Sequence, residues 1–178
     1  MEELEDPTER LKETMEAAEE KKEQWTLHVA LSTAIIAVLA AIAGLLGNHH
    51  ANESMLEQIR SSDQWAFYQS KSIKAEINAS TAQLLAAIGK PLPAENQQKA
   101  RQYDADKASI KDKADEAEKS SKAHLDQHVV FSRAVTIFQI AIALSAIAIL
   151  TRKKLMWYVS MLLALAGCFF LAQGFMTH

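Results

Sequence analysis

Three long apolar segments alternate with strongly polar ones along the chain. They occupy residues 25–47, 129–150 and 155–176, and each slightly exceeds the ~20 residues that a helix needs to cross ~30 Å of hydrocarbon. Apolar side chains surround the whole circumference of each predicted helix, which argues against amphipathic helices in a soluble bundle. The pattern predicts an all-α integral membrane protein with three transmembrane helices.

The polar stretch between the first two apolar segments, residues 48–128, has the pattern of two further helices. Residues 48–88 contain no proline or glycine, and apolar side chains recur there four or seven positions apart, at Met55, Ile59, Ala66, Ile73, Ile77, Leu84 and Ile88. A glycine and two prolines within residues 89–93 end this helix, and a second helical pattern starts at about residue 94. So short a connection predicts an antiparallel, coiled-coil-like hairpin.

The return arm of this hairpin has little apolar surface. Its thin apolar line consists of Ala100, Tyr103, Ile110, Ala114, Ala117 and Leu125. Helix propensity contributes only tenths of a kcal/mol per residue, so two such helices are marginally stable by themselves. We therefore expect hairpins from several copies to pack together in a homo-oligomer.

The N-terminal segment, residues 1–24, is acidic and carries one narrow apolar stripe. Leu4, Leu11, Ala18 and Trp25 recur every seven residues, which predicts an amphipathic helix that begins near Pro7. This helix either continues the first span in solvent or uses its stripe for self-association or for lying along the membrane.

Charge divides the chain into the same segments. All 22 acidic residues lie within 1–24 and 53–126, whereas 25–47 and 129–178 contain no carboxylate. The basic loop, residues 151–154, contains three adjacent cations and is the only connection between the second and third spans. Such loops stay on the cytoplasmic side of the membrane. The N-terminus is then also cytoplasmic, and the hairpin lies on the opposite side.

Four histidines flank the membrane end of the predicted hairpin. His49 and His50 follow the first span, and His124 and His128 precede the second. His124 and His128 are one helical turn apart, as are His49 and Glu53. Imidazole and carboxylate ligands suit a divalent transition metal such as zinc, nickel or iron. The alternatives are pH sensing through protonation, or a histidine that simply suits the headgroup boundary.

Three aromatic residues, Trp65, Phe67 and Tyr68, lie close together on the outgoing arm. Side chains one and three positions apart span much of a helix circumference, so they do not all face one narrow seam. We expect a subunit interface here, with a groove for a partner protein or ligand as the alternative.

Two polar residues interrupt the second span. Arg133 lies one turn inside it and Gln139 lies near its middle, where polar groups are costly. They either line a pore, or Arg133 extends to the headgroups while Gln139 forms an interhelical hydrogen bond.

No motif indicates an enzyme. The sequence lacks a Gly-rich phosphate loop, a Gly-x-Ser-x-Gly turn, a His-Glu-x-x-His helix and a Cys-x-x-Cys pair. The single cysteine, Cys168, lies in the third span, so no disulfide framework or thiolate cluster is expected. The net charge is −3 and no basic face for nucleic acid is present. We expect a non-enzymatic protein without catalytic residues, and no cofactor apart from the transition metal considered above.

At residues 47–53 (GNHHANE) and 63–71 (DQWAFYQSK), the chain resembles an uncharacterised family of bacterial membrane proteins, domain of unknown function 4337. The likeness continues through residues 89–91, 128–140 and 150–158, so it covers nearly the whole chain. The resemblance implies a bacterial inner-membrane protein, whose hairpin is then periplasmic. It implies no established activity.

Three functions remain open from the sequence. The leading hypothesis is a homo-oligomeric membrane protein whose projecting hairpin is a scaffold or docking element for an unknown partner. The first alternative is an ion channel or transport pore formed by the oligomer. The second alternative is metal or pH sensing through the histidine cluster.

Overall fold

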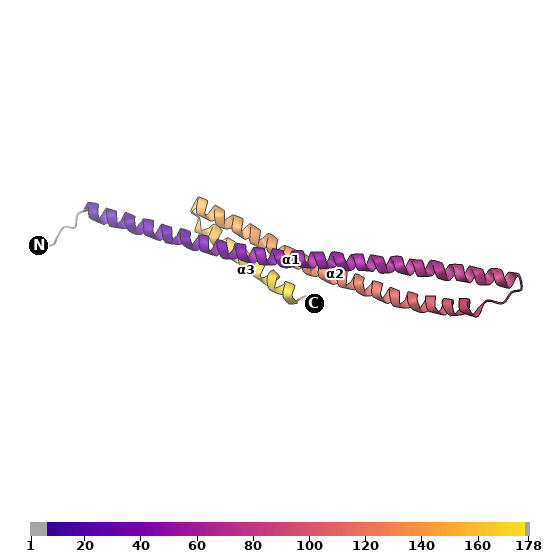
Figure 1. Cartoon of the computed structure of the whole chain (residues 1–178). Helices are drawn as coiled ribbons and strands as arrows, with labels where there is room; N and C mark the ends of the chain where they lie inside the picture. The colour runs from indigo at the N-terminus through magenta and orange to yellow at the C-terminus, as the bar shows by residue number, and fades with distance from the viewer. Residues whose placement is uncertain (1–6, 177–178) are drawn as a thin grey trace. The chain divides into compact units, whose positions relative to one another are not determined.

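The computed structural model describes residues 7–176, which form three helices joined by two short connections (Figure 1). Helix α1 spans Pro7–Ala87, α2 spans Ala94–Thr151 and α3 spans Lys154–Met176. Each contains a stretch long and apolar enough to cross a membrane. The expectation of an all-α protein with three such helices is therefore confirmed. Of the N-terminal helix expected at residues 1–24, residues 1–6 lie outside the described part.

A glycine ends α1. Gly89 has a φ of 72°, and the amide of Lys90 donates to the carbonyl of Leu85 at 2.9 Å while the amide of Gly89 donates to that of Ala86 at 3.1 Å. This pair of hydrogen bonds is a Schellman motif, which satisfies carbonyls that the helix end leaves without partners. Pro91 and Pro93 prevent continuation, and α2 begins directly after Pro93.

The helices form two compact units. One comprises residues 48–128, and the other combines residues up to 47 with residues from 129 onward. We call the first the polar unit and the second the apolar unit. Helices α1 and α2 each contribute one segment to the polar unit and another to the apolar unit, and α3 belongs to the apolar unit.

The core of the apolar unit combines two phenylalanine rings with small side chains. Phe131 and Phe138 are fully buried, and alanines at positions 43, 134 and 141 pack with Phe138 and Ile36. Gly167 and Gly174 of α3 lie directly against Phe138 and Phe131. A side chain at either glycine would overlap the ring, so these glycines allow α3 to approach α2 closely.

Serine hydroxyls add polar links inside this apolar unit. Ser160 of α3 donates to the carbonyl oxygen of Ala141 in α2 at 2.7 Å, and Ser145 Oγ lies 2.7 Å from Ser160 Oγ. The indole of Trp157 donates to Ser32 Oγ of α1 at 3.1 Å. These bonds connect α3 to both other helices of the unit.

In the polar unit, residues early in the α1 segment contact residues late in the α2 segment. His50 contacts His124, Ser54 contacts Ser121, Lys71 contacts Asp106, and Asn78 contacts Asn96. Residue numbers fall along α2 as they rise along α1. Each pair is joined by a hydrogen bond between polar groups, rather than by apolar packing.

Candidate functional site

The two segments of the polar unit meet along a seam of small and polar side chains. Ser54 and Ser61 of α1 and Ser121 of α2 are buried there. Ser121 Oγ donates to the carbonyl oxygen of Ser54 at 2.8 Å, and the two hydroxyl oxygens are 3.2 Å apart. Ile110, Ala114 and Ala117 are the buried apolar residues that α2 contributes. Small side chains and satisfied hydroxyls permit close approach of the two helices.

The predicted apolar stripe of α1 does not lie in this seam. Six of its large side chains are between 52% and 70% exposed, namely Met55, Ile59, Ile73, Ile77, Leu84 and Ile88. Ala66, the small member of the stripe, is exposed as well. At 100° per residue the stripe lies on the opposite side of α1 from Ser54, Ser61 and Tyr68. The outgoing helix therefore uses its polar face within the chain and leaves its apolar face uncovered.

The three aromatic residues do not share one face of α1. Trp65 and Tyr68 are half-buried, and their rings meet edge to face at 5.6 Å between centroids. Phe67 is 49% exposed. Lys71 Nζ lies 5.4 Å from the Phe67 centroid and 2.7 Å from Asp106 Oδ2. Part of the aromatic group thus serves contacts within the chain, and Phe67 has surface left for another molecule.

The histidine cluster is brought together in part. Nδ1 of His50 lies 3.1 Å from Nδ1 of His124, their ring centroids are 5.3 Å apart, and the His49 ring is 5.4 Å from that of His50. One Nδ1 must donate and the other accept, so at least one of the two rings is neutral. Burial lowers the pKa of His50 below its ordinary 6.5, and neighbouring charges act in the order His124, His49, Glu53 and His128, of which only Glu53 raises it.

The metal hypothesis stays a prediction. Among the side chains that the structure describes, no group of three or more His, Cys, Asp or Glu is placed to hold a metal ion. Two nitrogens on one tetrahedral zinc would be about 3.3 Å apart, given zinc–nitrogen bonds of ~2.0–2.1 Å. The His50–His124 pair is close to that separation, but a further ligand would have to move toward it.

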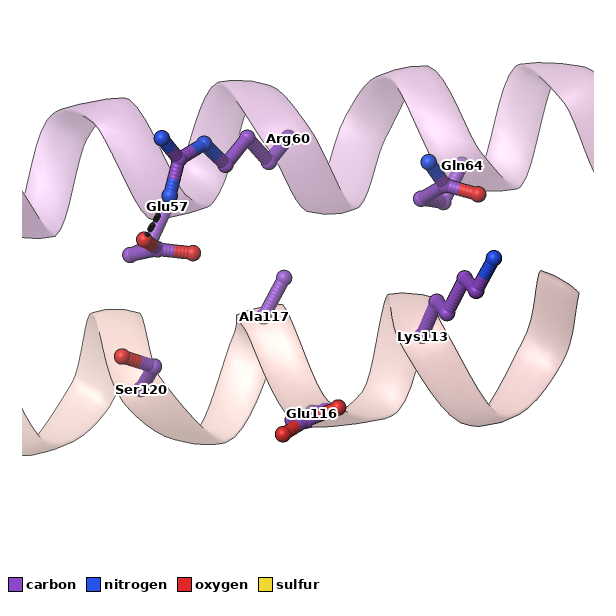
Figure 2. A pocket seen from close by; sticks show the side chains of 7 residues that line it. All are labelled: Glu57, Arg60, Gln64, Lys113, Glu116, Ala117 and Ser120. Carbon is purple, nitrogen blue, oxygen red and sulfur yellow. Dashed lines mark hydrogen bonds and ion pairs between the residues drawn. The ribbon is translucent and has the colours of Figure 1, made fainter.

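A groove that sequence reasoning missed crosses the seam (Figure 2). Its volume is about 510 Å³, and its lining comes from both segments of the polar unit: Glu57, Arg60, Gln64, Lys113, Glu116, Ala117 and Ser120. Glu57 and Arg60 form an ion pair on α1, and Ala117 points toward α1 between the two helices in Figure 2. Each helix contributes both signs of charge through its own residue spacing, and the helix register, which the sequence does not specify, brings the charges of the two helices together.

Arg133 and Gln139 are both exposed on α2 in the apolar unit. In the described part of the chain, neither side chain forms a hydrogen bond or ion pair with another residue. The described residues thus give Gln139 no interhelical hydrogen bond, and its side chain is exposed on the surface of the apolar unit.

Comparison with known proteins gives a single classification. A family model, described as a domain of unknown function (DUF4337), matches residues 25–177. No curated protein and no solved structure matches the chain. The match covers all three apolar segments and the whole polar unit, so the chain belongs to the DUF4337 family.

Proposed function

We propose that this chain is a non-enzymatic, homo-oligomeric protein of the bacterial inner membrane, whose extramembrane helices form a scaffold or docking element. The apolar segments 25–47, 129–150 and 155–176 are inserted in the bilayer, and the polar unit is an antiparallel hairpin in the periplasm. The observation that carries the proposal is the uncovered apolar stripe of α1 on the face opposite the seam.

A second copy of the chain is the best occupant for the stripe. Its four- and seven-residue spacing is that of a coiled-coil helix, which pairs with a helix of the same pattern. Copies inserted in one membrane by the same helices hold their stripes at the same height, and confinement raises their effective concentration. Fully burying a Leu, Ile or Met side chain contributes roughly 1.5–3 kcal/mol, so covering each half-exposed member contributes on the order of 1 kcal/mol.

The orientation rests on charge. Arg152, Lys153 and Lys154 connect α2 and α3, and a short basic loop of this kind is retained in the cytoplasm. α2 then runs inward and α3 outward, which assigns the polar unit to the periplasm. The polar residue Gln139 supports oligomerisation within the bilayer too, because contact with a neighbouring copy is less costly for an amide than contact with lipid.

Native mass spectrometry of the full-length protein in a mild membrane mimetic tests the proposal. We expect a defined complex of two or more copies for the wild type, and loss of subunits in the Ile73→Glu/Ile77→Glu variant. The matched control is Lys74→Gln/Gln83→Glu, which changes the net charge by the same amount at exposed positions of α1 off the stripe. A monomeric wild type, or equal masses for both variants, would overturn the proposal.

A transport pore is the second candidate, and the exposed Gln139 is the observation that favours it. An amide facing the axis of an oligomer would line a water-filled path, with Arg133 nearer its mouth. Conductance across planar bilayers that falls on Gln139→Leu would support this candidate. An oligomer that passes no ions under voltage or pH steps would remove it and leave the scaffold.

A further inference from the structure

A basic pocket lies in the apolar unit, at the end of the three helices that holds the loop between α2 and α3. Its volume is about 450 Å³, and α1, α2, the loop and the start of α3 contribute its lining: Ala18, Lys21, Lys22, Trp25, Thr26, Ile149, Arg152 and Lys154. The members from α1 recur at three- and four-residue spacing and therefore share one face of that helix.

The lining combines four cations with no carboxylate. In the described part of the chain, none of Lys21, Lys22, Arg152 and Lys154 forms an ion pair. The acidic residues of the same helix, among them Glu19, Glu20 and Glu23, do not line the pocket. Arg152 also adopts a φ of 55°, a conformation that non-glycine residues rarely take, at the sharp turn between α2 and α3. Like charges gathered without counterions indicate a site for an anion.

The remaining lining is apolar and aromatic. Ala18, Ile149 and the Trp25 ring form it, and Trp25 lies at the first residue of the apolar segment 25–47. Trp25 also has a buried side-chain nitrogen without a hydrogen-bond partner among the described side chains. This N–H is covered in the structure, so a modest rotation of the indole would be needed to offer it to an oxygen atom. Cations beside an apolar wall suit a phosphate ester that is attached to hydrocarbon.

We propose that this pocket binds the phosphate of an anionic phospholipid at the cytoplasmic face. The proposal rests on the membrane insertion proposed above, but not on the oligomer. Arg152 and Lys154 contact the phosphate oxygens, Lys21 and Lys22 approach from α1, and the glycerol end of the lipid lies against Trp25 and Ile149. Binding at this point joins α1 to the loop that connects α2 and α3.

Native mass spectrometry of the full-length protein with added lipids provides the test. The probes are phosphatidylglycerol, cardiolipin, phosphatidylcholine and inorganic phosphate, each titrated separately. We expect the two anionic lipids to be retained in preference to phosphatidylcholine, and inorganic phosphate to compete weakly. The Arg152→Gln/Lys154→Gln variant should bind phosphatidylglycerol roughly tenfold or more weakly, because cations near anionic lipid each add to binding.

Two comparisons keep the result unambiguous. Lys21→Gln/Lys22→Gln alters the same pocket from α1 without touching the α2–α3 turn and should weaken binding as well. Lys111→Gln/Lys119→Gln removes two exposed cations from the polar unit and should bind lipid like the wild type. Equal affinity of pocket and control variants, or equal retention of phosphatidylcholine, would overturn the proposal. Tight competition by inorganic phosphate would assign the site to a free anion instead. The same spectra report the subunit number, so loss of lipid selectivity and loss of the oligomer are seen separately.

Discussion

Replacing Gly167 by alanine should separate α3 from α2. An added Cβ would lie 2.6 Å from Cε1 and 2.7 Å from Cδ1 of the Phe138 ring, well inside van der Waals contact. Phe138 is fully buried, so its ring cannot move into solvent without disturbing the residues packed around it. Overpacking of this kind typically costs about 1–3 kcal/mol, because side chains or backbone must shift.

Gly44→Ala is the matched control. The nearest atom to an added Cβ there is Val135 Cγ2 at 3.9 Å, an ordinary contact. Both substitutions gain the same helix propensity, so the difference between them isolates the overlap with the ring. We expect Gly167→Ala to be less stable than Gly44→Ala by about 1–3 kcal/mol.

Equilibrium unfolding in mixed micelles measures this difference. Trp157 fluorescence is a suitable reporter because its indole donates to Ser32 across the α3–α1 contact. Adding Phe138→Leu to Gly167→Ala removes the obstructing ring edge, so the double variant should lose less stability than the two single changes sum to. Equal stabilities of the Gly167 and Gly44 variants would refute the close α2–α3 packing.

Three further changes concern the polar unit. Ser121→Ala removes the hydrogen bond to the Ser54 carbonyl and should cost about 0.5–1.5 kcal/mol of unfolding free energy, measured in the same micelles; an unchanged value would contradict the polar seam. Lowering the pH below 6.5, the ordinary pKa of histidine, should weaken the contact of His50 with His124. The folded protein has the lower His50 pKa, so the unfolded chain binds the proton more readily and the free energy of unfolding decreases as the pH decreases. Hydrogen exchange of neighbouring amides, corrected for its intrinsic dependence on pH, checks this, and the effect of pH should be smaller in His124→Gln, where burial still acts on His50. If the metal hypothesis is correct, zinc should raise the thermal midpoint of the wild type but not of His124→Gln; equal midpoints would exclude the pair as ligands.

Sequence periodicity was sufficient to predict the helices, but not to predict which helix faces contact each other. Continuous apolar runs predict α3 and the apolar parts of α1 and α2, because a helix that is apolar around its whole circumference is either buried in a protein core or spans a membrane. In the polar unit, the spacing of apolar residues identifies the helix face that carries Ile73 and Ile77, but it does not indicate what covers that face. The seam forms instead through Ser54 and Ser121, since small hydroxyl side chains permit a close approach that a hydrophobicity pattern does not reveal.

The candidate sites also depend on how helical segments that are distant in sequence align with each other. Spacing groups His124 with His128 on one helix, whereas the contact between His50 and His124 depends on how the two segments align. Likewise, Lys21 and Arg152 are far apart in sequence, and the basic loop that contains Arg152 indicates only membrane orientation when read along the chain. Their common pocket requires α1 to lie beside the α2–α3 turn.

The most direct test of the central claim is cysteine cross-linking of the full-length protein in its native membrane. In a Cys168→Ala background, cysteines introduced singly at Ile73, Ile77 and Leu84 should form disulfide-linked dimers under mild oxidation. The pairing requires Cβ atoms within about 4.5 Å, which only a shared interface brings together. A cysteine at the exposed position Gln83, off the stripe, should remain unlinked. Absence of dimers at all three stripe positions, or equal cross-linking at Gln83, would contradict assembly through this face.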